Sequence, residues 1–146
     1  MMAYQTLKVI FMQYTTKQHE QANSIILSWA KAQHLKMQRG AMPLNFKQIL
    51  CGKTYNRSTA KKLTSFNYHN DYEESNTVFE DLFLTPKGDY FLCGEGMERT
   101  PYAAKMGVFD DWMRGHGILP LTLKQVKEWC EFRGLNDEID SILNPT

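Results

Sequence analysis

The sequence lacks several features that mark familiar classes of protein. Its three cysteines, Cys51, Cys93 and Cys130, lie far apart and form no Cys-x-x-Cys pair, so we expect reduced thiols rather than a disulfide framework or a zinc site. No apolar run approaches the roughly 20 residues of a membrane-spanning helix. The N-terminus does not show the pattern of a secretory signal. Together these absences predict a cytoplasmic protein that does not contact a membrane.

The chain also lacks a strong net charge, which is +1 over 146 residues. It therefore has no global field to attract nucleic acid or anionic lipid. The charges are nevertheless unevenly placed, because residues 47–62 hold five cations and no acid, whereas acids gather at 71–81 and 128–140. Such stretches are either solvated faces or sites of partner contact.

Motifs for cofactor and metal binding are missing as well. Gly94 and Gly96 start a G-x-G pattern, but Arg99 stands where a dinucleotide fingerprint needs its third glycine. The four histidines are scattered, and none has the spacing of a zinc ligand pair. We therefore expect no cofactor, no metal and no enzymatic activity. Two alternatives stay open: a hard cation held by Glu95, Glu98, Asp110 and Asp111, and a nucleophilic pair of Cys93 with His116.

Periodicity predicts the elements of the N-terminal half. Residues 6–12 read as a strand, and residues 16–38 as a long helix that begins with a capping box of Thr15 and Gln18. Residues 46–51 read as a short strand. Asn56 is placed to cap a helix running to about residue 65, and the polar span 66–77 reads as loop.

The most informative stretch is 78–103, which begins as a β-hairpin. The runs 78–84 and 90–93 favour strands, and Pro86 and Gly88 supply the turn between them. The glycines at 94 and 96 are expected to end the second strand where the chain passes close to another segment, or else to frame a binding loop that presents Glu95. Thr100 and Pro101 then predict a short helix to residue 107.

The C-terminal part reads as a loop at 108–117, a strand at 118–121 and two helices. Thr122 and Gln125 form a second capping box, and the first helix ends at Gly134. Asn136 can cap the last helix. The predicted core residues are Trp29, Phe83, Phe91, Leu92, Val126, Trp129 and Ile139.

These elements predict an α+β fold, in which a small antiparallel sheet is covered by one long N-terminal helix and several short helices. The expected strands are 6–12, 46–51, 78–84, 90–93 and 118–121. The expected organisation is an N-terminal strand-helix unit at 1–43, packed on a hairpin-containing α+β domain at 44–146.

Several motifs in this order resemble a recurrent group of small phage, plasmid and bacterial proteins. The matching letters are GKTYN at 52–56 with TA at 59–60, LFLTPKG at 82–88, YFL at 90–92 with GEG at 94–96, PYA at 101–103, and PLT at 120–122 with EW at 128–129. The group often has glycine where Met97 stands and Met-Ser-Lys-Tyr at 99–102, so the geometry of that loop is expected to differ. The resemblance implies an accessory protein of a mobile element, such as an inhibitor of anti-CRISPR type.

Three functions follow as hypotheses. The leading one is a non-enzymatic protein that binds a host protein or ribonucleoprotein complex and inhibits a nucleic-acid-processing defence complex. The second is a small nucleic-acid-binding regulator that uses a basic helix. The third is a cryptic enzyme built on Glu95, Cys93 and His116. The candidate partner-binding residues are Lys53, Arg57, Lys61, Lys62, Glu95, Glu98 and Arg99.

Overall fold

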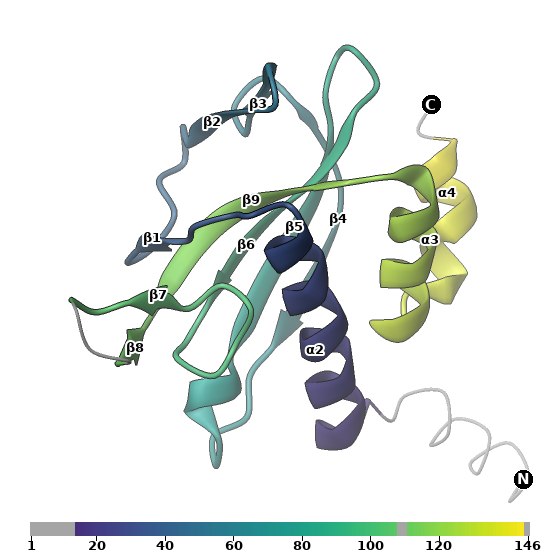
Figure 1. The fold of residues 1–146 in the computed structure, drawn as a ribbon. Helices are drawn as coiled ribbons and strands as arrows, with labels where there is room; N and C mark the ends of the chain where they lie inside the picture. Colours follow the sequence, from purple (N-terminus) through teal and green to yellow (C-terminus); the bar gives the residue numbers. More distant parts are fainter. Residues whose placement is uncertain (1–13, 108–110, 145–146) are drawn as a thin grey trace, which may run out of the picture.

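A five-stranded antiparallel sheet forms the centre of the fold in the computed structural model, which describes residues 14–107 and 111–144. In neighbour order its strands are β1 (Gln38–Arg39), β9 (Gly115–Leu121), β6 (Tyr90–Gly96), β5 (Val78–Leu84) and β4 (Lys61–Tyr68). Figure 1 shows α2 and the C-terminal helices against one face of this sheet. The α+β prediction, with an N-terminal helix over an antiparallel sheet, is confirmed.

The β5–β6 hairpin forms as the sequence predicts. Val78–Leu84 pairs in register with Tyr90–Gly96, so that Leu82 lies opposite Leu92. The turn closes where the Gly88 amide donates to the Thr85 carbonyl over 2.9 Å. Gly88 adopts a φ of +92°, which glycine reaches without steric penalty.

Three helices cover one face of the sheet: α2 (Thr16–Ala32), α3 (Leu123–Phe132) and α4 (Ile139–Leu143), the last preceded by the 3₁₀ turn η2 (Asn136–Glu138). Both predicted capping boxes are present, at Thr15 with Gln18 and at Thr122 with Gln125. Helix α2 ends at Ala32, before the predicted residue 38, because the chain turns at His34 with a φ of +56°. Beyond this turn the chain enters β1.

The opposite face is partly covered by a two-stranded ribbon of β2 (Lys47–Leu50) and β3 (Lys53–Asn56). Beneath it a small second core brings Tyr55 together with Phe83, Phe91 and Ile118. The strand predicted at 46–51 therefore exists, but it belongs to this ribbon and not to the main sheet. The described residues also form a small second ribbon, in which β7 (Ala104–Lys105) pairs with β8 (Trp112–Met113), and the 3₁₀ turn η1 (Glu74–Asn76).

The main core lies between the helices and the sheet. Five of the predicted core residues are buried: Phe83, Phe91, Leu92, Val126 and Trp129. Trp29 and Ile139 are partly buried and pack against the main cluster. Five of the seven predicted positions thus lie in the interior, because alternate strand residues and one helix face must turn away from water.

Three local predictions are wrong. The helix expected from Asn56 is absent, because the Asn56 side chain closes a turn by accepting from the Ser58 amide over 2.9 Å, and β4 then pairs with β5 as far as Tyr68. This strand also occupies the start of the predicted loop at 66–77. The helix expected after Thr100 is replaced by turns and β7.

Two strand boundaries also differ from the prediction. Strand β6 does not end at residue 93 but continues to Gly96, and β9 begins at Gly115 inside the loop expected at 108–117. Cross-strand pairing of β6 with β9 over 90–96 and 115–121 overrides the local glycine signal. The strand predicted at 6–12 lies outside the described residues.

Candidate functional site

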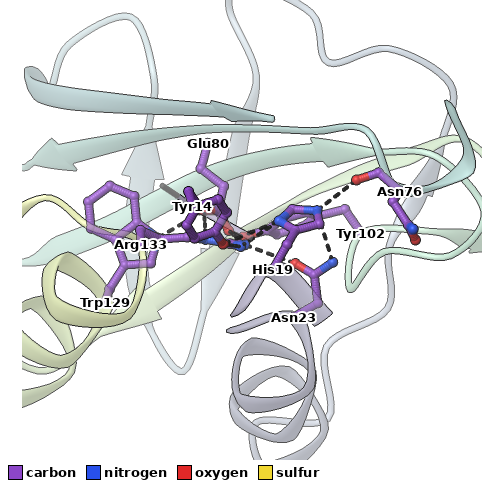
Figure 2. A network of polar contacts seen from close by, with 8 residues as sticks. All are labelled: Tyr14, His19, Asn23, Asn76, Glu80, Tyr102, Trp129 and Arg133. Carbon is purple, nitrogen blue, oxygen red and sulfur yellow. Dashed lines mark hydrogen bonds and ion pairs between the residues drawn. The ribbon is translucent and has the colours of Figure 1, made fainter. Parts of the chain in front are cut away.

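A buried polar network anchors the elements around the candidate site (Figure 2). At its centre is Glu80 of β5, which is fully buried. One carboxylate oxygen accepts from Trp129 Nε1 at 2.9 Å and from Arg133 Nε at 2.8 Å. The other accepts from Arg133 Nη2 at 3.1 Å and from the Tyr102 hydroxyl. Strand β5, helix α3 and the segment 97–103 are thereby joined at one carboxylate.

The same guanidinium holds helix α2. Arg133 Nη1 donates to the Tyr14 hydroxyl at 2.9 Å and lies 3.2 Å from His19 Nδ1. Arg133 Nη2 donates to Asn23 Oδ1 at 3.0 Å. His19 Nε2 in turn donates to the Asn76 carbonyl at 2.8 Å, which ties η1 to α2. Within the described part of the chain, no buried side-chain nitrogen or oxygen lacks a hydrogen-bond partner.

Burial sets the protonation of this network. It lowers the pKa of His19 to about 4, an effect to which the Arg133 charge adds and which the Asn76 hydrogen bond opposes. Burial, reinforced by Glu80, raises the pKa of Tyr102 well above its usual value. For Arg133, burial favours the neutral form, but the Glu80 carboxylate outweighs it and raises the pKa. The network therefore holds an ion pair surrounded by neutral donors and acceptors at neutral pH.

Glycines let the segment 97–103 pack directly on the sheet. A side chain on Gly94 would overlap the ring of Tyr102, and one on Gly96 would overlap the side chain of Thr100. A side chain on Gly115 would meet the backbone of the same segment, at the Tyr102 carbonyl. The prediction that these glycines allow close approach is confirmed, whereas the prediction that they end the strand is wrong. Their consequence is that this segment packs closely on the sheet and forms a wall facing α2.

Between this wall and α2 lie two adjoining hollows, with cavity volumes of about 430 and about 910 Å³. They share Leu27, Lys31, Pro101, Ala103 and Trp112. We call the combined feature the α2 groove. Its lining residues come from α2 and from the segment leading to β7 and β8, whose backbones lie beside each other in Figure 1.

One face of α2 forms a side of the α2 groove. Glu20, Ser24, Leu27 and Lys31 line it, and their spacing places them on one helix face. Ala22, Ile26 and Ala30 are buried. Leu27 therefore lies off the buried stripe and remains 38% exposed, opposite Trp112, which is 48% exposed.

The structure separates the residues predicted to bind a partner. Glu98 and Arg99 line the α2 groove and are exposed. Glu95 points to the opposite face, where it accepts from the Met42 amide at 2.9 Å and pairs with Arg114. It is a structural link between two chain segments there, and not a neighbour of Glu98.

The predicted basic residues lie on β3, β4 and the turn between them. Lys53 pairs with Asp89 at 2.9 Å, and Arg57 and Lys62 both pair with Asp81, at 3.4 and 3.5 Å. Lys61 lies at the start of β4. These pairs offset much of the positive charge that the sequence suggests, and the residues do not share a helix face.

The arrangement around Cys93 does not favour a nucleophile. Burial raises the pKa of the Cys93 thiol to about 12, and the reactive form of cysteine is the thiolate. His116 is buried as well, and its Nδ1 lies 2.8 Å from the Gly40 carbonyl. Glu95 is the cross-strand partner of His116, but its carboxylate is already bonded to Met42 and Arg114.

The sequence reasoning missed most of the α2 groove: Leu27, Lys31, Lys36, Arg39, Lys105 and Trp112. One signal was present, because no acid occurs between Glu20 and Asp71, so the basic stretch extends well before residue 47. Another was Leu27, which falls outside the periodic stripe of buried residues.

None of the protein-family models, curated proteins or solved structures compared with the chain matches it. Within residues 14–107 and 111–144, no group of three or more histidine, cysteine, aspartate or glutamate side chains is placed to hold a metal ion. In the same described ranges, no helix has both the length and the apolar character needed to cross a bilayer.

Proposed function

We propose that this chain is a non-enzymatic binding protein and that the α2 groove is its recognition surface. The observation that carries the proposal is that two exposed apolar side chains, Leu27 and Trp112, line the same hollow, beside a helix and a segment that the buried network ties together. Exposed aromatic and aliphatic side chains in a preformed hollow are typical anchors of protein interfaces.

The buried network supports this proposal because it fixes both sides of the α2 groove. Arg133 binds α2 through Asn23, while Glu80 binds the 97–103 segment through Tyr102. A surface that is already ordered loses little conformational entropy when a partner docks.

The biological role remains the one that the resemblance implies. We propose that the partner is a host protein or ribonucleoprotein complex and that binding inhibits a nucleic-acid-processing complex. This step is an analogy from the motifs at 52–60, 82–103 and 120–129, since fold alone does not assign a function.

Affinity capture with paired variants tests the proposal. The groove variant carries Leu27→Asp and Trp112→Ala, and the control carries Leu44→Asp and Tyr72→Ala, which alter an exposed aliphatic and an exposed aromatic residue elsewhere. Each protein is used to capture partners from a lysate of its native host cells, with and without nuclease. We expect the wild type and the control to capture the same partner in stoichiometric amounts. The groove variant should not capture it.

Two results would contradict this function. A partner retained equally by the groove variant would move recognition to another face. Recovery that nuclease abolishes, together with loss on Arg57→Glu and Lys62→Glu, would favour the nucleic-acid regulator instead.

A further inference from the structure

We infer that the α2 groove binds a polypeptide segment in which an apolar anchor is flanked on one side by carboxylates. This inference rests on the proposed function and adds the chemistry and direction of the partner. Two observations support it: the distribution of charge along the groove and the character of its lining.

The charge of the α2 groove changes from one end to the other. At the N-terminal end of α2 the charged lining residues are two acids, Glu20 and Glu98, and Arg99, while Lys31 lines both hollows. Toward the C-terminal end the charged lining residues are Lys31, Lys36, Arg39 and Lys105, and no acid is among the described residues that line this part. A carboxylate would therefore be attracted more strongly at the second end than at the first, where acids balance the cations.

Two cations at this end, Lys31 and Lys36, differ from the predicted basic residues of β3, β4 and the turn between them. Within the described ranges, Lys31 and Lys36 are exposed and take part in no ion pair, whereas Lys53, Arg57 and Lys62 each face an aspartate. Their charge is therefore available to a partner.

Two further contacts hold the rim in shape. Arg39 Nε donates to the Lys105 carbonyl over 3.0 Å, which leaves the two terminal nitrogens of the guanidinium as the group that can bind a carboxylate in a bidentate manner. Lys105 Nζ lies 5.7 Å from the centre of the Trp112 ring. The apolar and the basic parts of the groove are thus adjacent.

The floor of the groove favours polypeptide over nucleic acid. Leu27, Pro101 and Ala103 provide aliphatic surface, and Trp112 is the one aromatic side chain among the described lining residues. Single-stranded nucleic acid is usually held by successive aromatic platforms along a continuously basic channel. The acids at the far end, Glu20 and Glu98, would oppose a phosphate backbone that extends along the groove.

The geometry also gives the direction of binding. The anchor occupies the space between Leu27 and Trp112, which both hollows share. The carboxylates then lie toward Lys36 and Arg39, beyond the C-terminal end of α2. A cation on the opposite flank of the segment would face Glu20 and Glu98.

Selection from a random peptide library displayed on phage tests this inference, with the full chain as bait. We expect enriched peptides to carry an aromatic or large aliphatic residue next to two or more Asp or Glu residues. The strongest peptide, made synthetically with a fluorescent label, is then titrated against three proteins: the wild type, Lys31→Glu/Lys36→Glu, and the control Lys47→Glu/Lys87→Glu. The two double variants have the same net charge.

We expect the Kd to weaken roughly ten-fold or more in Lys31→Glu/Lys36→Glu, as two reversed rim charges would produce, and to change little in the control. Raising the salt from about 0.1 to about 1 M shortens the screening length from ~10 to ~3 Å, and it should weaken binding to the wild type and the control more than binding to Lys31→Glu/Lys36→Glu. Far-ultraviolet circular dichroism verifies that each variant is folded.

The remaining outcomes separate the two proposals. The selected peptides could depend on Leu27 and Trp112 but be neutral or basic, or their Kd could be unchanged by Lys31→Glu/Lys36→Glu. Either result overturns the inference of a carboxylate flank and leaves the proposed function standing. Peptides that bind equally well to Leu27→Asp/Trp112→Ala, or no enriched peptide at all, contradict both. A labelled oligothymidylate could instead bind more tightly than any selected peptide. If Lys31→Glu/Lys36→Glu abolishes that binding, the α2 groove is assigned to nucleic acid.

Discussion

The Tyr102 hydroxyl donates a hydrogen bond to the buried carboxylate of Glu80, and it can do so because the residue across the strand from Glu80 is a glycine. Gly94 pairs with Glu80 in the β5–β6 register, and the Tyr102 ring fills the space that a side chain at Gly94 would take. The GEG motif therefore places one wall of the α2 groove. Packing of the segment 97–103 thus accounts for Gly94 and Gly96, and a ligand-binding role is not needed to explain them.

Replacing Gly94 with alanine should be more destabilising than replacing Gly117. The new methyl group of Gly94→Ala meets a rigid, fully buried ring, whereas in Gly117→Ala it meets the flexible end of Met37. We expect Gly94→Ala to lower the free energy of unfolding by roughly 1–3 kcal/mol and Gly117→Ala by less. Urea denaturation measures both. Equal losses would mean that the Tyr102 ring is not fixed over Gly94.

Removing the charge of Arg133 alone should strongly lower the free energy of unfolding. Arg133→Met leaves the Glu80 carboxylate buried without its counter-ion, and breaking a buried ion pair in this way costs about 3–5 kcal/mol. At this chain length the melting temperature should fall by roughly 2–4 °C for each kcal/mol lost. Calorimetry gives this shift directly.

The double variant Glu80→Gln/Arg133→Met is the control for the ion pair. Because the double variant removes both charges, its loss of stability should be smaller than the sum of the losses measured for Arg133→Met alone and for Glu80→Gln alone. Additive losses would show that the two side chains act independently.

His19 predicts a specific dependence of stability on pH. Its pKa is lowered to about 4 in the folded protein, while the unfolded chain has the ordinary value of about 6.5. Between about pH 4 and pH 6.5 the imidazole is protonated in the unfolded chain but neutral in the folded protein. The contribution of His19 to the free energy of unfolding is therefore complete above about pH 6.5 and is lost as the pH falls toward 4. The shift corresponds to roughly 3 kcal/mol.

Urea denaturation across this pH range measures the effect, and His19→Gln isolates it. The variant is expected to be less stable at neutral pH, since it loses network contacts, and its stability should fall less steeply toward low pH. A slope unchanged from the wild type would assign the acid sensitivity to other groups.

The three thiols should differ sharply in reactivity. Burial raises the pKa of Cys93 to about 12 and that of Cys130 to about 11, so almost no thiolate forms on either at neutral pH, whereas Cys51 is exposed. We expect iodoacetamide to modify Cys51 first and the other two only after unfolding. Peptide mass spectrometry locates the modified residues. Rapid labelling of Cys93 in the folded protein would revive the hypothesis of a nucleophile beside His116.

Local signals predicted the elements whose causes lie within a few residues. The capping boxes at Thr15 and Thr122 are satisfied by side chains three residues away, and the hairpin turn depends on Pro86 and Gly88. These features appear in the structure as predicted because no distant segment competes with them.

Prediction failed where pairing between distant segments outweighs local preference. Residues 61–68 form β4 because β5 offers hydrogen bonds along their whole length, although Asn56 suggested a helix cap. Likewise, β6 continues through two glycines because β9 pairs with it on the other side. The basic residues 53–62 consequently lie on a ribbon and an edge strand, beside aspartates that are distant in sequence.

The sequence by itself determined the α+β class, the hairpin, the starts of α2 and α3 and several of the buried residues, since periodicity and turn chemistry are local properties. Only the tertiary structure decided the α2 groove, because Leu27, Arg39 and Trp112 come from separate segments whose approach depends on sheet order. It likewise decided which cations are paired, since an ion pair depends on the distance between two side chains and not on the number of lysines in a stretch.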